Sequence, residues 1–181
     1  MEEQISKLTN NPKLLRPSLS QLLGNKEMVG VELGIGGGYN AVNIVLNLDI
    51  QTLYVVDAIS CNHQLIPFLR NNSKLVMLQG ITSYDAREKV HELLDFVYID
   101  ADHSYDGCKL DMETWFPKLK PSGQLCGHDY NLPGVKQAVD EFAEKNGLKV
   151  KFGVVKDDHM NYRTEAVYTE GNLLDWWLEK N

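Results

Sequence analysis

MVGVELGIGGGYNAVNIV, residues 28–45, is the stretch that decides the fold. The apolar run Met28–Leu33 passes into a turn with four glycines, and a segment with helical spacing follows over Tyr39–Asn47. A strand, a glycine-rich turn and a helix in this order are typical of the first unit of an open α/β sheet, which binds ligands beyond the carboxyl ends of its strands. We therefore expect a nucleotide-like ligand at this turn.

The same alternation continues outward from this unit and predicts a doubly wound α/β fold with a mainly parallel sheet. The predicted strands are mostly apolar, because a central parallel strand is covered on both faces: Met28–Leu33, Thr52–Asp57, Lys74–Gln79, Asp95–Asp100 and Gly123–Gly127. The predicted helices fill the intervening segments: Tyr39–Asn47, Asn62–Asn71, Ser83–Leu94, Asp106–Leu119 and Gly134–Lys145. Ser83 is the predicted N-cap of its helix.

The chain after Gly147 has a different pattern. LKVKFGVV and YRTEAVY, joined by the polar stretch KDDHMN, predict an antiparallel pair of strands. The ending LLDWWLEKN predicts a short capping helix, and a dimer contact or a cover over the active site is the alternative. On a helix, Trp176 and Trp177 would lie about 100° apart and could not both face one core.

Length and spacing predict a single domain of 181 residues. We divide it into an N-terminal helical cover (1–27), a catalytic core (28–168) and a C-terminal tail (169–181). The cover is expected to be interrupted at Pro17 and to pack against one side of the sheet through five leucines, Leu14, Leu15, Leu19, Leu22 and Leu23.

Composition and charge restrict the class of partner. The chain has 18 Lys+Arg against 25 Asp+Glu and a net charge of −7, which makes nucleic acid an unlikely partner and favours a small molecule. It has no signal-peptide core and no apolar run of about 18 residues, so we expect a cytoplasmic protein without a membrane segment. Cys61, Cys108 and Cys126 have neither disulfide nor zinc spacing and are expected to be reduced. A homo-oligomer is one way in which so short a chain could complete a pocket.

The charge at the glycine turn indicates which cofactor binds there. Glu32 would oppose the pyrophosphate that a dinucleotide-binding loop holds, but it suits the ammonium of S-adenosylmethionine. Asp57 can accept both ribose hydroxyls of either cofactor, and Thr82 and Ser83 would lie beside the adenine. We expect S-adenosylmethionine. An NAD-dependent oxidoreductase and a noncatalytic cofactor-binding module are the alternatives.

Acidic and histidine side chains follow two further strands, in FVYIDADHSYDG and CGHDYN. If these strands are neighbours, Asp100 emerges beside His128 and Asp129, and this oxygen-dominated set suits Mg²⁺ better than zinc. Asp102 and His103 follow at the same edge. Capping of loops by Asp and His is the alternative, and we favour the site because functional groups of α/β proteins concentrate at these strand ends.

The motif Glu-Leu-Gly-Ile-Gly-Gly-Gly-Tyr-Asn, which begins at Glu32, resembles the first motif of class I S-adenosylmethionine-dependent methyltransferases, especially of the catechol and caffeoyl-CoA O-methyltransferases. The resemblance implies that Glu32 contacts the methionine amino group and that Asn40, in place of the usual Ser, contacts the methionine carboxylate. The full set of expected cofactor-binding residues is Glu32, Gly34, Gly36, Gly38, Tyr39, Asn40, Asp57, Thr82, Ser83 and Asp100.

The second motif, Asp-Ala-Asp-His from Asp100, resembles the Asp-Ala-Asp-Lys of caffeoyl-CoA O-methyltransferases and the signatures of bacterial methyltransferases that act on sugars and antibiotics. It implies metal ligands at Asp100, His128 and Asp129. His103 takes the place of a catalytic lysine, so His103 or Asp102 is expected to remove the acceptor's proton. The implied reaction is O-methylation of a small polar acceptor, such as a sugar or a hydroxylated metabolite, assisted by Mg²⁺.

Overall fold

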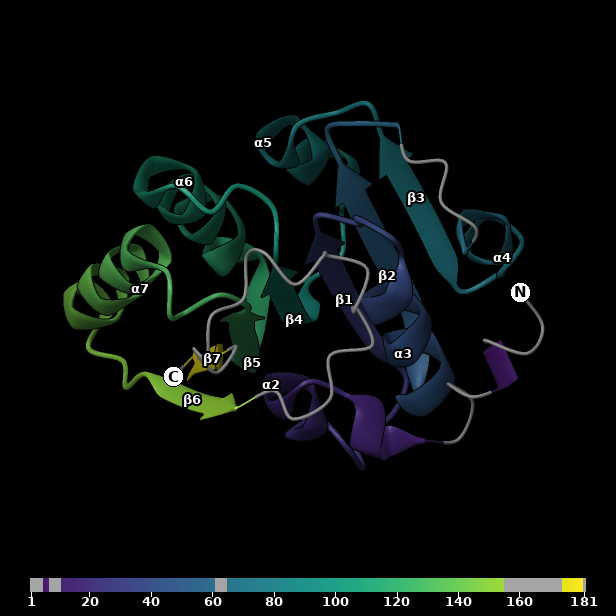
Figure 1. Cartoon of the computed structure of the whole chain (residues 1–181), viewed down its shortest axis with the longest axis horizontal. Helices are drawn as coiled ribbons and strands as arrows, with labels where there is room; N and C mark the ends of the chain where they lie inside the picture. Colours follow the sequence, from purple (N-terminus) through teal and green to yellow (C-terminus); the bar gives the residue numbers. More distant parts are fainter. Residues whose placement is uncertain (1–4, 7–10, 61–64, 155–173, 181) are drawn as a thin grey trace, which may run out of the picture.

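A seven-stranded sheet forms the centre of the structure, a computed structural model that describes residues 5–6, 11–60, 65–154 and 174–180 (Figure 1). The strand order is β3-β2-β1-β4-β5-β7-β6. Strands β1 to β5 are parallel, and β7 is antiparallel to both of its neighbours. The bounds are β1 Met28–Leu33, β2 Ile50–Asp57, β3 Leu75–Gln79, β4 Leu94–Ile99, β5 Leu119–Gly127, β6 Lys151–Val154 and β7 Leu174–Glu179. The predicted α/β fold is confirmed.

Helices cover both faces of this sheet and enclose two hydrophobic cores. One face carries η1 (Pro12–Leu14), α2 (Pro17–Ser20), α3 (Tyr39–Asn47) and α4 (Ile66–Arg70). The other face carries α5 (Ser83–Ala86), η2 (Arg87–Lys89), α6 (Tyr105–Trp115), η3 (Phe116–Lys118) and α7 (Pro133–Asn146). The sheet is therefore buried on both sides, which explains why its central strands read as continuous apolar runs.

One predicted helix, Ser83–Leu94, is wrong in its length. The segment forms only the short α5 and η2, and Leu94 is already the first residue of β4. Val90 takes an extended conformation with φ −101° and is fully buried, so the chain leaves the helix to reach the sheet. The N-cap is Thr82, whose hydroxyl accepts from the Asp85 N–H at 3.1 Å, rather than Ser83. The other predicted elements differ mainly at their ends.

The C-terminal part of the sheet is antiparallel, as predicted, and it is formed by β6 and β7. Residues 162–168, the predicted second strand, lie outside the described residues, so their pairing stays a prediction; β6 pairs with β7. The predicted capping helix is therefore wrong, and the predicted tail contributes a strand to the sheet. Successive side chains of a strand point to opposite faces, so Trp176 and Trp177 are both buried, at 0% and 8% exposure, in different cores.

The N-terminal cover packs as predicted against one face of the sheet. Leu15, Leu19 and Leu22 are buried in the same core as α3, whereas Leu23 is 47% exposed. The cover is interrupted at Pro17 as predicted, because η1 ends at Leu14 and Pro17 begins the separate helix α2, where its missing N–H has no intrahelical partner to lose.

Two of the three cysteines, Cys108 and Cys126, lie within the described residues as buried free thiols. Among the described helices, none combines the length and the apolar character that crossing a membrane requires.

Candidate active site

The predicted site residues lie at one edge of the sheet, where the strand order changes direction between β1 and β4. Such a switch point is the ligand-binding position of open α/β sheets. Backbone hydrogen bonds fix the segments that leave the strands: the Asp100 N–H donates to the Leu33 carbonyl at 2.8 Å, and the His128 N–H donates to the Ile99 carbonyl at 3.1 Å. The loops after β1, β4 and β5 therefore begin side by side.

The glycine turn after β1 lies directly against the loop after β4. Gly34 has φ +90°, and a Cβ atom at this position would lie 2.0 Å from the Asp100 carbonyl oxygen. Only glycine therefore permits this approach of the two backbones. Gly36 and Gly38 also have positive φ, and Gly38 is the N-cap of α3, directly before Tyr39, which is buried.

Glu32 of β1 is buried, with 1% exposure, although it carries a carboxyl group. Its Oε1 accepts a hydrogen bond of 2.9 Å from the Asn40 amide, and its Oε2 is buried without a hydrogen-bond partner among the described residues. Burial raises the pKa of Glu32 to about 8, and the charges of Asp100 and Asp57 act in the same direction, against the Asn40 hydrogen bond and the charge of Arg16. This carboxyl group lacks a donor for one oxygen.

Asp57, at the end of β2, supports the glycine turn from the other side. Its Oδ2 accepts from the Ile35 N–H at 2.9 Å, and its Oδ1 accepts from the Ile59 N–H at 2.8 Å. Both carboxylate oxygens therefore lie at the end of β2 and hold the backbone of the glycine turn and of the loop after β2.

The residues predicted beside the adenine make local contacts. Thr82 is exposed and caps α5. Ser83 donates its hydroxyl to the carboxyl group of Asp111 in α6, a buried residue that the sequence did not single out. Burial raises the pKa of Asp111 to about 6; the hydrogen bond from Ser83 opposes this shift, and the nearby charge of Asp102 adds to it.

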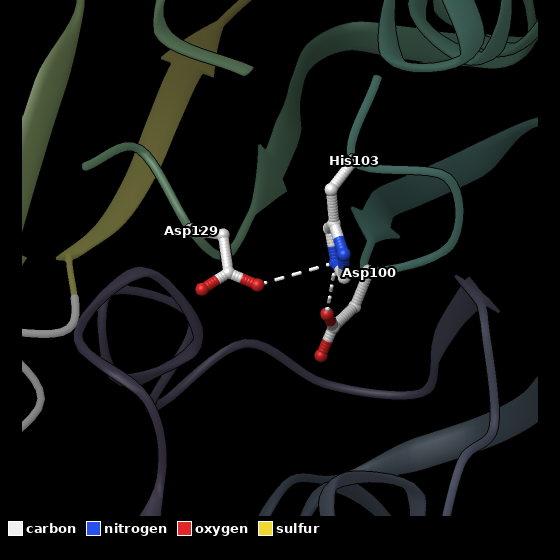
Figure 2. A group of neighbouring side chains, drawn as sticks. All are labelled: Asp100, His103 and Asp129. Atoms are coloured by element: carbon white, nitrogen blue, oxygen red, sulfur yellow. Dashed lines mark hydrogen bonds and ion pairs between the residues drawn. The ribbon is translucent and has the colours of Figure 1, made fainter. Parts of the chain in front are cut away.

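Three side chains from the loops after β4 and β5 converge at the edge of the sheet, as Figure 2 shows. The His103 Nε2 lies 3.2 Å from the Asp100 Oδ1 and 3.2 Å from the Asp129 Oδ2. The three potential ligand atoms all lie within 4.8 Å of one another. The arrangement can hold a proton or a metal ion.

This cluster differs from the predicted metal set at one position, because His103 converges with the two carboxylates and His128 does not. The His128 Nδ1 lies 3.3 Å from the Asp129 Oδ1, and its Nε2 is buried without a hydrogen-bond partner in the described part of the chain. Asp129 therefore lies between two imidazoles. Its φ of +58° is unusual for a residue with a side chain, and aspartate tolerates this conformation better than most residues.

Asp102 occupies a different position from the other two aspartates. It is exposed, and its Oδ1 accepts from the Ser104 N–H at 2.9 Å at the start of α6. Hydrogen bonds from the backbone and the side chain of Ser104 lower its pKa, which weakens it as a base. These contacts match the loop-capping alternative, and a catalytic role of Asp102 stays a prediction.

Sequence reasoning missed Arg16, whose side chain is 8% exposed. Its Nη2 lies 3.8 Å from the Asp100 Oδ2, and its guanidinium lies 5.8 Å from the centre of the Tyr98 ring. Burial alone would raise the pKa of Asp100, but the His103 hydrogen bond and the charges of Arg16 and His128 lower it. Proximity of Arg16 to a strand end 84 positions away cannot be read from the sequence, and a charged residue within a leucine-rich stretch was the sole signal.

A family model described as a methyltransferase domain matches residues 31–130, more than half of the chain. The chain belongs to the class I S-adenosylmethionine-dependent methyltransferases. This methyltransferase domain begins within β1 and extends past Asp129, so it contains the glycine turn and the Asp100–His103–Asp129 cluster. The prediction of the family from the two motifs is confirmed, and S-adenosylmethionine is supported as the cofactor over NAD.

Solved structures with the same fold include several methyltransferases. An O-methyltransferase from Bacillus cereus in complex with SAH has a TM-score of 0.66 at 16% identity, covering 98% of this chain and 90% of its own. A precorrin-6y C5,15-methyltransferase from Geobacter metallireducens has a TM-score of 0.62 at 17% identity (91% and 86% covered). The N-methyltransferase NodS from Bradyrhizobium japonicum has a TM-score of 0.61 at 15% identity (99% and 95% covered). No curated protein sequence matches this methyltransferase.

Proposed function

We propose that this methyltransferase transfers a methyl group from S-adenosylmethionine to an oxygen of a small polar acceptor, such as a sugar or a hydroxylated metabolite, with assistance from a divalent ion. The observation that carries the proposal is the convergence of Asp100, His103 and Asp129 at the edge that also bears the glycine turn. A cytoplasmic location and a homo-oligomeric state stay predictions.

The residues around the glycine turn fit the cofactor. Among the described residues, the Glu32 Oε2 lacks a donor that an ammonium would supply, and Gly34 lets the glycine turn lie against the loop after β4 at the switch point. Asp57 lies at the end of β2 beside the glycine turn, where a carboxylate can accept the ribose hydroxyls. The bound cofactor supplies the methyl group on a positively charged sulfur.

His103 is the proposed proton acceptor when no ion is bound. The carboxylates of Asp100 and Asp129 both face its Nε2, which favours the tautomer with the proton on Nε2 and the lone pair on Nδ1. The same two carboxylates stabilise the imidazolium that forms once Nδ1 has taken a proton from the acceptor hydroxyl. This arrangement uses paired acids to orient a base and does not require a metal.

Two carboxylates and one imidazole also fit a hard divalent ion such as Mg²⁺. Asp100 and Asp129 would hold the ion, with His103 as the third ligand in place of the predicted His128. A bound ion lowers the pKa of an acceptor hydroxyl that coordinates it. A neutral imidazole has one nitrogen lone pair, so if the His103 Nε2 bound the ion, Nδ1 would carry the proton and could not act as the base. Metal dependence therefore decides the role of His103.

The experiment measures release of S-adenosylhomocysteine with a panel of sugars, catechols and amines, before and after removal of metal with EDTA. We expect turnover with a hydroxylated acceptor, its loss in EDTA at nearly unchanged cofactor affinity, and its recovery on addition of Mg²⁺. Full activity in EDTA would remove the ion and leave His103 as the base. Cofactor binding without turnover on any acceptor would favour the noncatalytic module.

A further inference from the structure

The side chain of Asn40 contacts the protein at the place where the cofactor is expected to bind. We propose that Asn40 is a positioning residue that acts on the cofactor's ammonium through Glu32, and not a direct ligand of the methionine carboxylate. This inference rests on the proposed binding of S-adenosylmethionine at the glycine turn. It replaces the role that the motif alone implies for this position.

The hydrogen bond between Asn40 and Glu32 carries the argument. Asn40 is the second residue of α3, and its Nδ2 donates to the Glu32 Oε1 at 2.9 Å. An amide nitrogen is a donor only, so this contact has a fixed direction. The amide of asparagine also extends one bond farther from the helix than the hydroxyl of the serine that is usual here, which allows it to reach across to β1.

The consequence of this bond is that the two oxygens of Glu32 become different. Oε1 is occupied by Asn40, whereas Oε2 is buried without a partner among the described residues. An unsatisfied buried acceptor is costly, and a donor that reaches it is strongly bound. Without Asn40 the carboxyl group could rotate, and a ligand would have to fix its orientation on binding.

The surrounding charges indicate that the donor for Oε2 is a cation. Asp57 at the end of β2 and Asp100 at the end of β4 both act on Glu32 with negative charge, and Arg16 of the N-terminal cover opposes them. The Asn40 amide adds a hydrogen bond but no charge, so it leaves the negative potential uncompensated. An ammonium group would satisfy both the hydrogen bond and the charge.

The test compares three ligands on wild type and Asn40→Ala by calorimetry. S-Adenosylmethionine has an ammonium and a carboxylate, its decarboxylated form keeps only the ammonium, and 5′-methylthioadenosine has neither. We expect Asn40→Ala to lower the affinities for S-adenosylmethionine and for its decarboxylated form by a similar factor. This factor should be about tenfold, as for loss of a hydrogen bond to a charged group. The affinity for 5′-methylthioadenosine should not change. A loss confined to the ligand with a carboxylate would overturn the proposal.

A double-mutant cycle supplies the second readout. If Asn40 acts through Glu32, Asn40→Ala should have little further effect in a Glu32→Gln background, because the group that it positions is already changed. Additive losses would show an independent role and reject the inference. Asn47→Ala, which removes an amide from the other end of α3, is the control for the helix and should not alter the ratio of the three affinities. If wild type bound neither charged ligand, the proposed function itself would fail.

Discussion

At the residue scale, the buried carboxyl group of Glu32 connects the stability of this protein with the binding of its ligand. Glu32 is enclosed by the sheet and by α3, and burial raises its pKa to about 8. The carboxyl group therefore carries a proton near neutral pH when its site holds no cation. Binding of an ammonium requires the ionised form, so cofactor binding and loss of this proton are linked.

Replacing Glu32 by Gln should weaken S-adenosylmethionine binding by about 1.5–3 kcal/mol, the range for a hydrogen bond to a charged group. Gln keeps the size of the side chain but supplies no negative charge for the ammonium. Calorimetry with S-adenosylmethionine measures the loss, and 5′-methylthioadenosine is the control ligand. Equal affinity of the variant and wild type for S-adenosylmethionine would refute the role of Glu32.

Glu32 also predicts how stability changes with pH. Between its ordinary pKa of 4.5 and about 8, the folded protein retains a proton that the unfolded chain has released. The stabilisation from this group is complete below pH 4.5 and is lost as the pH rises through 8, so the free energy of unfolding should fall over this window. Urea unfolding of wild type and Glu32→Gln at pH 5.5, 7 and 8.5 isolates the effect, which we expect to be about 1–3 kcal/mol. Parallel pH profiles would contradict it.

Alanine variants of Gly34 and Gly36 form a matched pair that tests the contact between the glycine turn and the loop after β4. Gly34→Ala should cost more than about 3 kcal/mol, because the new Cβ would collide with the Asp100 carbonyl oxygen. Gly36→Ala adds a Cβ in open space at φ +50° and should cost about 1–2 kcal/mol. Urea unfolding measures both. Similar losses for the two variants would argue against the close approach.

The sequence predicted the strand-end acids because each directly follows an apolar run that has to be buried. Asp100 and Asp129 were found in this way, and β4 and β5 are indeed neighbours. Arg16 and Asp111 were not, because their importance depends on contacts with residues far away in the sequence. Local patterns locate the edge of the sheet but not the partners that the tertiary fold brings to it.

At the scale of elements, β7 shows why strand prediction succeeded for β1 and failed here. A strand covered on both faces has no polar alternation, so LDWWLE cannot be separated by period from a short helix. The glycine turn identified β1, whereas no comparable turn signal accompanied β7. The strand also reaches the site, because the Trp176 indole N–H donates to the His128 carbonyl at 3.1 Å.

Trp176→Ala should therefore destabilise the protein by about 3–5 kcal/mol, as expected for a large side chain removed from a core. Trp176 is fully buried, whereas Leu23 is 47% exposed. Leu23→Ala is therefore the control variant, and it should change the free energy of unfolding by no more than about 0.5 kcal/mol. Denaturant unfolding measures both. A small effect of Trp176→Ala would fit a surface helix and contradict the strand.

At the scale of the whole molecule, binding of the cofactor should appear as thermal stabilisation. A ligand at a hundred times its Kd stabilises the folded state by about 2.7 kcal/mol, which for a chain of this size raises Tm by about 5–10 °C. Differential scanning fluorimetry with S-adenosylmethionine should show this shift, and NAD at equal concentration should not. The reverse result would revive the oxidoreductase alternative.

The position of β7 also determines when the sheet can be completed during synthesis. Gln124 of β5 pairs with Glu179 of β7, and β6, which leaves the ribosome earlier, has β7 as its described neighbour. Until residues 174–179 have been made, β5 presents an unpaired edge and two tryptophans are missing from the two cores. Pairing over so long a separation is slow, and open strand edges promote aggregation. The nascent chain therefore passes through a vulnerable stage that ends only when its last described strand is inserted between two earlier ones.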